Sequence, residues 1–316
     1  MKKVIMTLVS VFVCLNVSYS QTIDDLVKGP IPGYTCTPDA GKFGILTEMV
    51  SISTKTMFDE DGNEITLEDL TGGLADPKMS MVNLYLTGEY SLNKNVGFLV
   101  NSPFFLKQQV RMNPASGYED YFTDKNGKIG LGDMTIGGWY FLIKNQIIQF
   151  MAHSCFTLAT GSSPENVNES EAASTGSGHS SFGVGASADF MMVPKILLSA
   201  GGRFTINNKA SFSTDGDSWD EKEGNQIHLW GRTSFKVMPN LSTGLDFEYF
   251  LKGATKVDGG ESSDSDLNYM NITPMVGCQL SLGTSIINIT GGYLLHISGK
   301  NFPKFNGFLI NTMIFF

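Results

Sequence analysis

The 316-residue sequence predicts an all-β protein, an up-and-down antiparallel β-barrel of about twelve strands that spans a Gram-negative outer membrane. Three observations lead to this prediction. Apolar and polar residues alternate with a period of two along most of the chain, short and long connections separate these segments in turn, and the chain ends on an apolar stretch, FNGFLINTMIFF. Because hydrocarbon offers no partner to backbone N–H and C=O groups, a sheet that crosses a membrane must close on itself.

Alternation is clear in the segment LSTGLDFEYFLKG, which begins at Leu241. Leu245 and Phe247 share one face of an extended chain, and Glu248 lies on the other face. Segments of this kind are close to the ~9–11 residues that a tilted membrane-spanning strand needs. The predicted strands cover residues 43–55, 79–91, 96–109, 131–143, 147–160, 182–192, 196–208, 226–238, 241–253, 268–281, 285–297 and 305–316.

The connections between these strands fall into two chemical classes. Short ones carry Asn, Gly or Pro, the residues that reverse a chain. Long ones are rich in Asp, Glu, Ser, Gly and Asn and hold most of the acidic charge, as solvated loops do. Short turns at one end and long polar loops at the other are typical of outer-membrane barrels, whereas the alternative, an exported β-sandwich, does not sort its connections so regularly.

The chain before the first predicted strand divides into two parts. Residues 1–20 are predicted to be a cleaved signal peptide, because two lysines precede an apolar run that ends on small residues. Residues 21–42 contain three prolines and few strand signals, so they either hang in the periplasm or fold into the lumen as a small plug. Residues 43–316 are the predicted barrel domain, located in the outer membrane.

Composition and the chain ends indicate which partners to expect. The terminal Phe316 resembles the C-terminal signal that bacterial outer-membrane barrels present to their insertion machinery. The predicted partners are therefore the barrel-assembly machinery, outer-membrane lipid, lipopolysaccharide and a small-molecule solute. A net charge of −9 argues against a nucleic-acid partner. Cys36, Cys155 and Cys278 are far apart, so no disulfide framework, metal site or cofactor is predicted.

Ionisable residues on the face opposite the lipid form the candidate site. Such side chains can meet across neighbouring strands, at roughly 0.2–1 kcal/mol per pair. They could form a polar wall that stabilises a narrow barrel, a constriction that selects solutes, or both. The lumen-lining candidates are Glu89, Lys107, His153, Asp189, Arg203, His228, Arg232, Lys236, Asp246, Glu248, Lys252 and His296.

A glycine-rich motif surrounds Asp133 in GKIGLGDMTIGGWYFL, and the next strand ends in LATGSSP. Gly132 and Asp133 would lie at the mouth beside Thr160 and Gly161, and Asp133 is predicted to cap a loop by accepting backbone N–H bonds. This pair of motifs resembles the outer-membrane transporter family of the meta-pathway of phenol degradation, whose members are described as barrels that pass small hydrophobic compounds. Pro103 is predicted to mark a bulge or kink in its strand, which in fatty-acid channels opens a lateral gate.

The sequence favours a channel for passive passage of small solutes, hydrophobic ones included. The alternative is a non-conducting structural or surface-interaction barrel whose acidic loops act outside the cell. A lipid-modifying enzyme is a minor alternative, because His153 and Ser154 point to opposite faces of a strand and no GxSxG or HExxH motif is present. No catalytic residue is therefore predicted.

Overall fold

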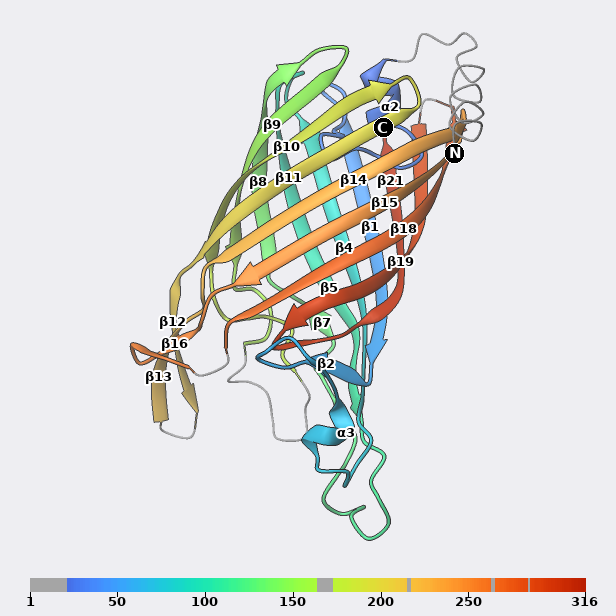
Figure 1. Ribbon diagram of the computed structural model, residues 1–316. Coiled ribbons are helices and arrows are strands. Elements are labelled where there is room, and N and C mark those ends of the chain that lie inside the picture. The colour runs from blue at the N-terminus through green and yellow to red at the C-terminus, as the bar shows by residue number, and fades with distance from the viewer. Residues whose placement is uncertain (1–21, 164–172, 215–216, 263–264, 284) are drawn as a thin grey trace.

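The computed structural model describes residues 22–163, 173–214, 217–262, 265–283 and 285–316, so the predicted signal peptide lies outside the described residues. The described chain forms a closed barrel of twelve antiparallel strands (Figure 1). The barrel strands are β1 (Phe43–Thr54), β4 (Lys78–Ser91), β5 (Val96–Arg111), β8 (Met134–Lys144), β9 (Ile148–Leu158), β10 (Ser181–Val193), β11 (Ile196–Asn207), β14 (Gln226–Met238), β15 (Leu241–Lys252), β18 (Leu267–Leu282), β19 (Ser285–Lys300) and β21 (Asn306–Phe315). The predicted fold is confirmed.

The barrel closes where β1 pairs with β21. Their register runs without interruption from Gly44 opposite Phe315 to Ser53 opposite Asn306. β1 also pairs along its length with β4, so neither of its edges is left without a partner. Phe308 of β21 is 65% exposed on the outer face. The apolar C-terminal stretch is therefore the strand that completes the cylinder and presents one face to lipid.

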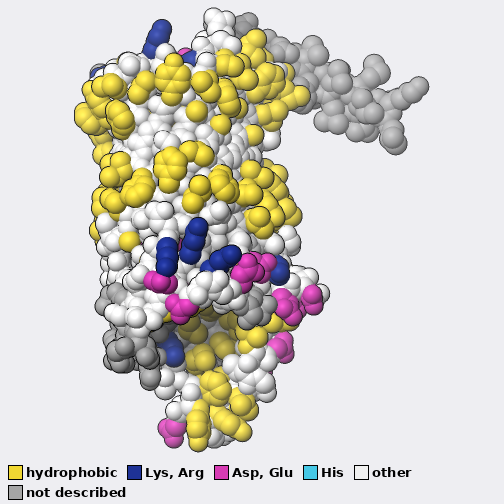
Figure 2. Space-filling model, turned by 90° about the vertical axis from the view of Figure 1, so that its left-hand side faces the viewer, with side chains coloured by type: hydrophobic (Ala, Val, Ile, Leu, Met, Phe, Trp, Pro, Cys, Tyr) yellow, Lys and Arg dark blue, Asp and Glu magenta, His cyan; other side chains and the backbone are white. Residues whose placement is uncertain are grey.

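The two faces of the wall differ as the alternation predicts. Large apolar side chains such as Phe182, Phe204 and Leu245 are exposed on the outside, whereas many polar side chains are buried inside. Figure 2 shows hydrophobic side chains over the upper part of the surface and charged side chains gathered below it, toward the long loops. This inside-out arrangement is the one that lipid outside and polar groups within require.

The long connections contain structure that the sequence pattern does not reveal. One group, at the bottom of Figure 1, comprises β2 (Thr56–Phe58), β3 (Glu64–Thr66), α3 (Leu67–Leu70) and β20 (Phe302–Pro303). A second sheet contains β12 (Lys209–Thr214), β13 (Asp217–Lys222), β16 (Lys256–Val257) and β17 (Gly260–Glu261). Two short bridges, β6 (Lys125–Asn126) and β7 (Gly130–Leu131), pair with the outer half of β5.

The segment before β1 begins with a short helix, α2 (Ile23–Val27), at the end of the barrel where the C-terminus lies (Figure 1). Thr22 and Asp25 form a capping box, in which each side chain accepts the other residue's backbone N–H. These reciprocal bonds satisfy donors that the first turn would otherwise leave unpaired. No helix in the described part of the chain is long and apolar enough to cross a membrane.

Candidate functional site

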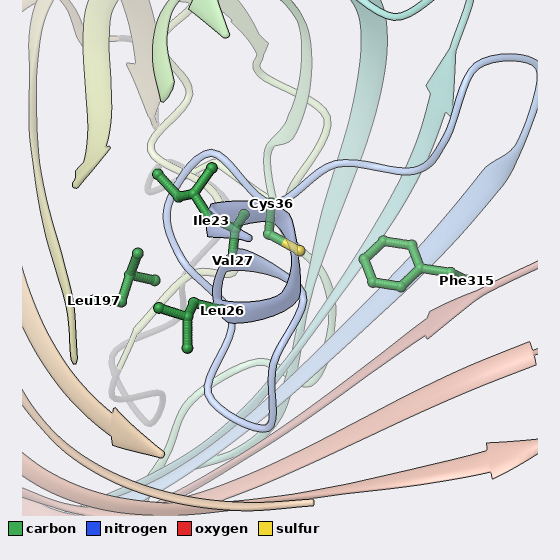
Figure 3. Close-up of a cluster of buried hydrophobic side chains, with 6 residues drawn as sticks. All are labelled: Ile23, Leu26, Val27, Cys36, Leu197 and Phe315. Atoms are coloured by element: carbon green, nitrogen blue, oxygen red, sulfur yellow. The ribbon is translucent and has the colours of Figure 1, made fainter. Parts of the chain in front are cut away.

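The N-terminal segment, residues 22–42, packs against the inner wall through apolar side chains. Three residues of α2 lie in one buried cluster with a cysteine that follows them and with two residues of the wall (Figure 3). The members of the cluster are Ile23, Leu26, Val27, Cys36, Leu197 and Phe315. Burial raises the pKa of the Cys36 thiol, because the thiolate would lose its hydration there. The segment therefore occupies this end of the lumen.

Asp189 is the main polar attachment of this segment. It is fully buried, and its carboxylate accepts the backbone N–H groups of Tyr34 at 3.1 Å and of Thr35 at 2.7 Å. The Thr35 hydroxyl donates a third bond at 2.6 Å. Three donors compensate much of the cost of burying a carboxylate, so Asp189 binds the segment rather than facing an open pore.

Arg232 of β14 and Asp246 of β15 form the second attachment. The guanidinium donates to both carboxylate oxygens, with Nε–Oδ1 at 2.5 Å and Nη2–Oδ2 at 2.6 Å. Its remaining Nη1 donates to the carbonyl oxygen of Pro32 at 2.5 Å. The Tyr34 hydroxyl donates to Asp246, and burial is the main reason that the pKa of this phenol is raised. Bidentate geometry of this kind fixes orientation as well as adding energy.

Further toward the long loops, Glu248 is the centre of a third polar group. Its carboxylate lies 2.7 Å from His228 Nε2 and accepts a bond from Asn271 at 2.8 Å. Beside it, the rings of Phe250 and Tyr269 stack with their centroids 5.2 Å apart. This part of the inner wall combines aromatic surface with hydrogen-bonding groups, which is the character of a small-molecule site.

The other predicted lumen residues are more scattered. His296 is buried and its ring bonds the carbonyl of Phe305, while Lys252 lies 3.6 Å from the Glu223 carboxylate. Lys107 is exposed beside a bulge, where Leu106 is an extra residue in β5.

This bulge moves Lys107 away from the inner face, and Gln108 is buried in its place. The structure therefore differs from the prediction for Lys107, because an extra residue reverses the alternation beyond it. The remaining candidates, Glu89, His153, Arg203 and Lys236, are half-buried.

A cavity of about 260 Å³ remains between the N-terminal segment and the wall formed by β1, β4, β19 and β21. Its lining combines two carboxylates, the guanidinium of Arg232, four other polar side chains and sulfur or apolar groups. The lining residues include Glu48, Glu89, Asn288, Thr290, Asn311, Cys36, Leu46 and Met313. Glu48 and Tyr34 are site residues that sequence reasoning missed. Alternation along β1 could have found Glu48, because it lies between the outward-facing Ile45 and Met49.

The pairing of β5 with β8 is interrupted halfway along β5. It covers Val96–Asn101, which lie opposite Tyr140–Thr135. From Phe104 onward, β5 pairs instead with β7 and β6, in a register shifted by one residue. Continuing the same register would place Pro103 opposite Asp133. A proline has no N–H to donate, and the Pro103 carbonyl instead accepts a bond from Gly132 N at 2.7 Å. We call this interruption the β5–β8 break.

Asp133 connects three segments next to the break. Its carboxylate accepts the backbone N–H of Gly161 at 3.0 Å and that of Ser177 at 2.7 Å, and the Ser177 hydroxyl at 2.9 Å. Thr160 donates its hydroxyl to the carbonyl of Gly132 at 3.0 Å. The motif residues thus meet at the mouth, and the sequence-distant Ser177 completes the arrangement.

The family comparison agrees with the motif. A family model described as "Putative MetA-pathway of phenol degradation" matches residues 80–312, most of the barrel. The chain belongs to this family. A comparison with curated proteins found no match.

Three solved structures match the chain to different extents. The COG4313 outer membrane channel from Pseudomonas putida F1 superposes with a TM-score of 0.66 at 16% identity, over 89% of this chain and 97% of that one. A FadL homologue from Pseudomonas aeruginosa gives a TM-score of 0.45 at 10% identity, over 87% and 90%. The toluene transporter TodX from Pseudomonas putida gives 0.42 at 12%, over 87% and 88%. The first of these likenesses supports the barrel fold.

Proposed function

We propose that the protein is an outer-membrane channel through which small hydrophobic solutes pass, entering at the long-loop end and leaving sideways through the β5–β8 break. The observation that carries the proposal is the break itself, together with Pro103. The wall stays paired here through β7 and β6, but the register shifts by one residue and Pro103 has no N–H to donate, so this junction of the wall is irregular. Family membership and the P. putida channel that shares the fold are consistent with transport.

The N-terminal segment supports a sideways exit rather than a straight one. Asp189, Arg232 and the buried cluster around α2 hold this segment across the end of the lumen opposite the long loops. The aromatic surface around Phe250 and Tyr269 lies on the loop side of these attachments. This surface lies on the wall opposite the break, so a hydrophobic solute that reaches it crosses the lumen, but not the segment, to leave through the break.

Two prolines in membrane-spanning strands provide a matched test. At Pro103 the register of pairing shifts by one residue as β8 gives way to β7. At Pro274 of β18 the register with β19 is the same on both sides, from Ile272 opposite Leu295 to Met275 opposite Gly292. Replacing Pro103→Val restores an N–H that can join the ladder, so it should narrow the break and slow solute entry. Pro274→Val should leave entry unchanged.

Entry is measured as the fluorescence rise of the neutral hydrophobic probe 1-N-phenylnaphthylamine in cells that express each variant. We expect about a threefold to tenfold slower rise for Pro103→Val, from one added hydrogen bond of about 0.5–1.5 kcal/mol. Equal rates in wild-type cells and in cells that lack the protein would contradict the transport proposal. They would favour the structural or surface-interaction barrel.

A further inference from the structure

A short segment of the chain lies across the inside of the β5–β8 break. Residues 173–179, which we call the strap, follow the long connection after β9 and lead into β10. Its first residues are held by Gln108 of β5, whose side-chain amide donates to the Ser174 carbonyl at 3.1 Å. The Lys128 N–H donates to the carbonyl of Ala173 at 2.9 Å. The strap therefore contacts both β5 and the segment that replaces β8.

The middle of the strap is in close contact with the residues of the break. A side chain at Gly132 would lie 2.9 Å from Pro103 Cγ and 2.9 Å from the carbonyl oxygen of Thr175, so backbone and proline meet there with no space left. Thr175 is buried. Gly161 and Gly176 approach as closely, with Gly176 Cα 2.7 Å from the position of a Gly161 Cβ. The strap therefore packs against the stretch of wall where β7 and β6 replace β8 as the partners of β5.

Two ionisable side chains, Asp133 and His179, form hydrogen bonds that hold the strap in place. Asp133 accepts two bonds from Ser177, as described above. Two residues further on, His179 is 3% exposed, with Nδ1 2.9 Å from the Ser177 carbonyl and Nε2 3.2 Å from the Glu221 carbonyl on β13. Its ring meets that of Phe212 on β12 edge-on at 5.3 Å.

Both ring nitrogens of His179 thus face acceptors. A neutral imidazole carries one N–H and can donate to only one of the two carbonyls, whereas the protonated ring donates to both. The titratable group that faces the ring from β13 is Glu221, whose carboxylate lies 3.9 Å from Nε2. β12 contributes the uncharged ring of Phe212. Asp133 is connected to the imidazole through Ser177, which bonds to both residues. The geometry fits the protonated ring better than the neutral one.

We propose that the strap is a latch that holds the β5–β8 break shut, that Asp133 and His179 fasten it, and that deprotonation of His179 loosens it. This inference rests on the proposed function, because a latch matters only if solute leaves through the break. It assigns the glycine-rich motif a regulatory role: Gly132, Gly161 and Gly176 allow the backbones to meet, and Asp133 fastens them.

Two variants release the latch, and one matched variant controls for the loss of a loop carboxylate. Asp133→Asn and His179→Gln each weaken one fastening. Asp59→Asn alters a carboxylate that likewise accepts backbone N–H groups, those of Asp61 and Asn63, but lies in another loop. Hydrogen exchange of residues 173–179 in purified protein should accelerate about tenfold in Asp133→Asn, the effect of losing a hydrogen bond to a charged group, and stay unchanged in Asp59→Asn.

The part played by the proton is tested by measuring the same exchange at about pH 5.5 and about pH 7.5, after correction for intrinsic exchange. Wild-type protein should show the strap more protected at the lower pH. His179→Gln should show no such difference. A pH dependence that persists unchanged in His179→Gln would overturn the part assigned to His179.

A reversible lock connects the latch to transport. Asp133→Cys combined with Ser177→Cys places two thiols where carboxylate and hydroxyl now meet, in a chain whose native cysteines at 36, 155 and 278 are replaced by alanine. Probe entry should be slow in the oxidised protein and return on reduction. Equal entry in both states, or unchanged exchange in Asp133→Asn, would overturn the latch. Wild-type entry at the background rate would instead overturn the proposed function, while exchange still decides whether the strap is fastened.

Discussion

The β1–β21 seam and the β5–β8 break are two junctions in one barrel with opposite properties. At the seam, ten consecutive positions pair between Gly44–Ser53 and Phe315–Asn306. At the break, six positions of β5 pair with β8, and four more pair with β7 and β6 in a register shifted by one residue. The seam joins two strands of unbroken alternation, whereas the break coincides with Pro103 and with Gly130, whose φ of +145° is outside the range of an ordinary strand residue. Local chemistry thus decides where the pairing between neighbouring strands is regular and where its register shifts.

The seam is also supported from inside. Cys36 of the N-terminal segment lies 3.7 Å from the sulfur of Met313, and Phe315 belongs to the buried cluster around α2. The break is covered instead by the strap, which is held by a few polar bonds. The comparison predicts a rigid seam and a junction that opens at low cost.

Hydrogen exchange tests the contrast directly and should give the largest effect. Amides of residues 102–107 that point toward β8 should exchange about a hundredfold faster than those of residues 307–314 in β21. The reason is that Pro103 has no N–H to donate and the register shifts beside it, so fewer regular ladder bonds, each worth about 1 kcal/mol, protect this stretch. Mass spectrometry of the protein in detergent or nanodiscs provides the measurement. Equal protection of the amides at the two junctions would contradict the expected difference in rigidity between the seam and the break.

A charge on the lipid face should weaken the seam strongly. Ile310→Lys introduces a cation near the middle of β21, which should cost about 2–4 kcal/mol in a membrane. Asn311→Lys, one residue along, faces the lumen and should cost much less. Urea titration of folding into lipid vesicles reports both, and similar losses for the two variants would contradict the assigned faces.

Weakening the contacts of Asp189 should loosen the N-terminal segment that lies behind the seam. Asp189→Asn removes the charge that accepts bonds from Tyr34 and Thr35, at about 1.5–3 kcal/mol for hydrogen bonds to a charged group.

Labelling of Cys36 with a maleimide should then become at least about tenfold faster, because burial and the raised thiol pKa now slow the reaction. Cys278 serves as an internal reference in the same protein. Unchanged Cys36 labelling would show that Asp189 does not hold the segment.

The smallest effect is expected in a loop remote from both junctions. Asp69 caps α3, and its bonds with Thr66 lower the pKa of this carboxyl below its ordinary value. Because the folded pKa is depressed, the cap is intact above the ordinary Asp pKa and is lost as pH falls through the lower folded value. Asp69→Ala should remove this acid titration in NMR spectra while exchange at seam and break stays unchanged.

Much of the barrel could be predicted because the alternation that assigns the two faces of a strand is visible within each short stretch of sequence. The alternation around Leu245 and Phe247 assigns the faces of β15, and the same pattern in β21 predicts closure. Lys107 shows the limit: the bulge at Leu106 is set by how β5 meets β4, so a period of two counted through it places the side chain on the wrong face. Asp133 could be recognised as a motif, but its partner Ser177 follows 44 residues later with no local signature.

The sequence by itself determined the number of strands, their two faces and the need for closure, because a period of two and the cost of unpaired backbone in lipid act on every segment alike. Only the tertiary structure decided where residues 22–42 lie, which charges bind them and which pair of strands is interrupted. Those outcomes depend on contacts such as Tyr34 with Asp246, separated by 212 residues, and on three-dimensional fit that no local pattern encodes.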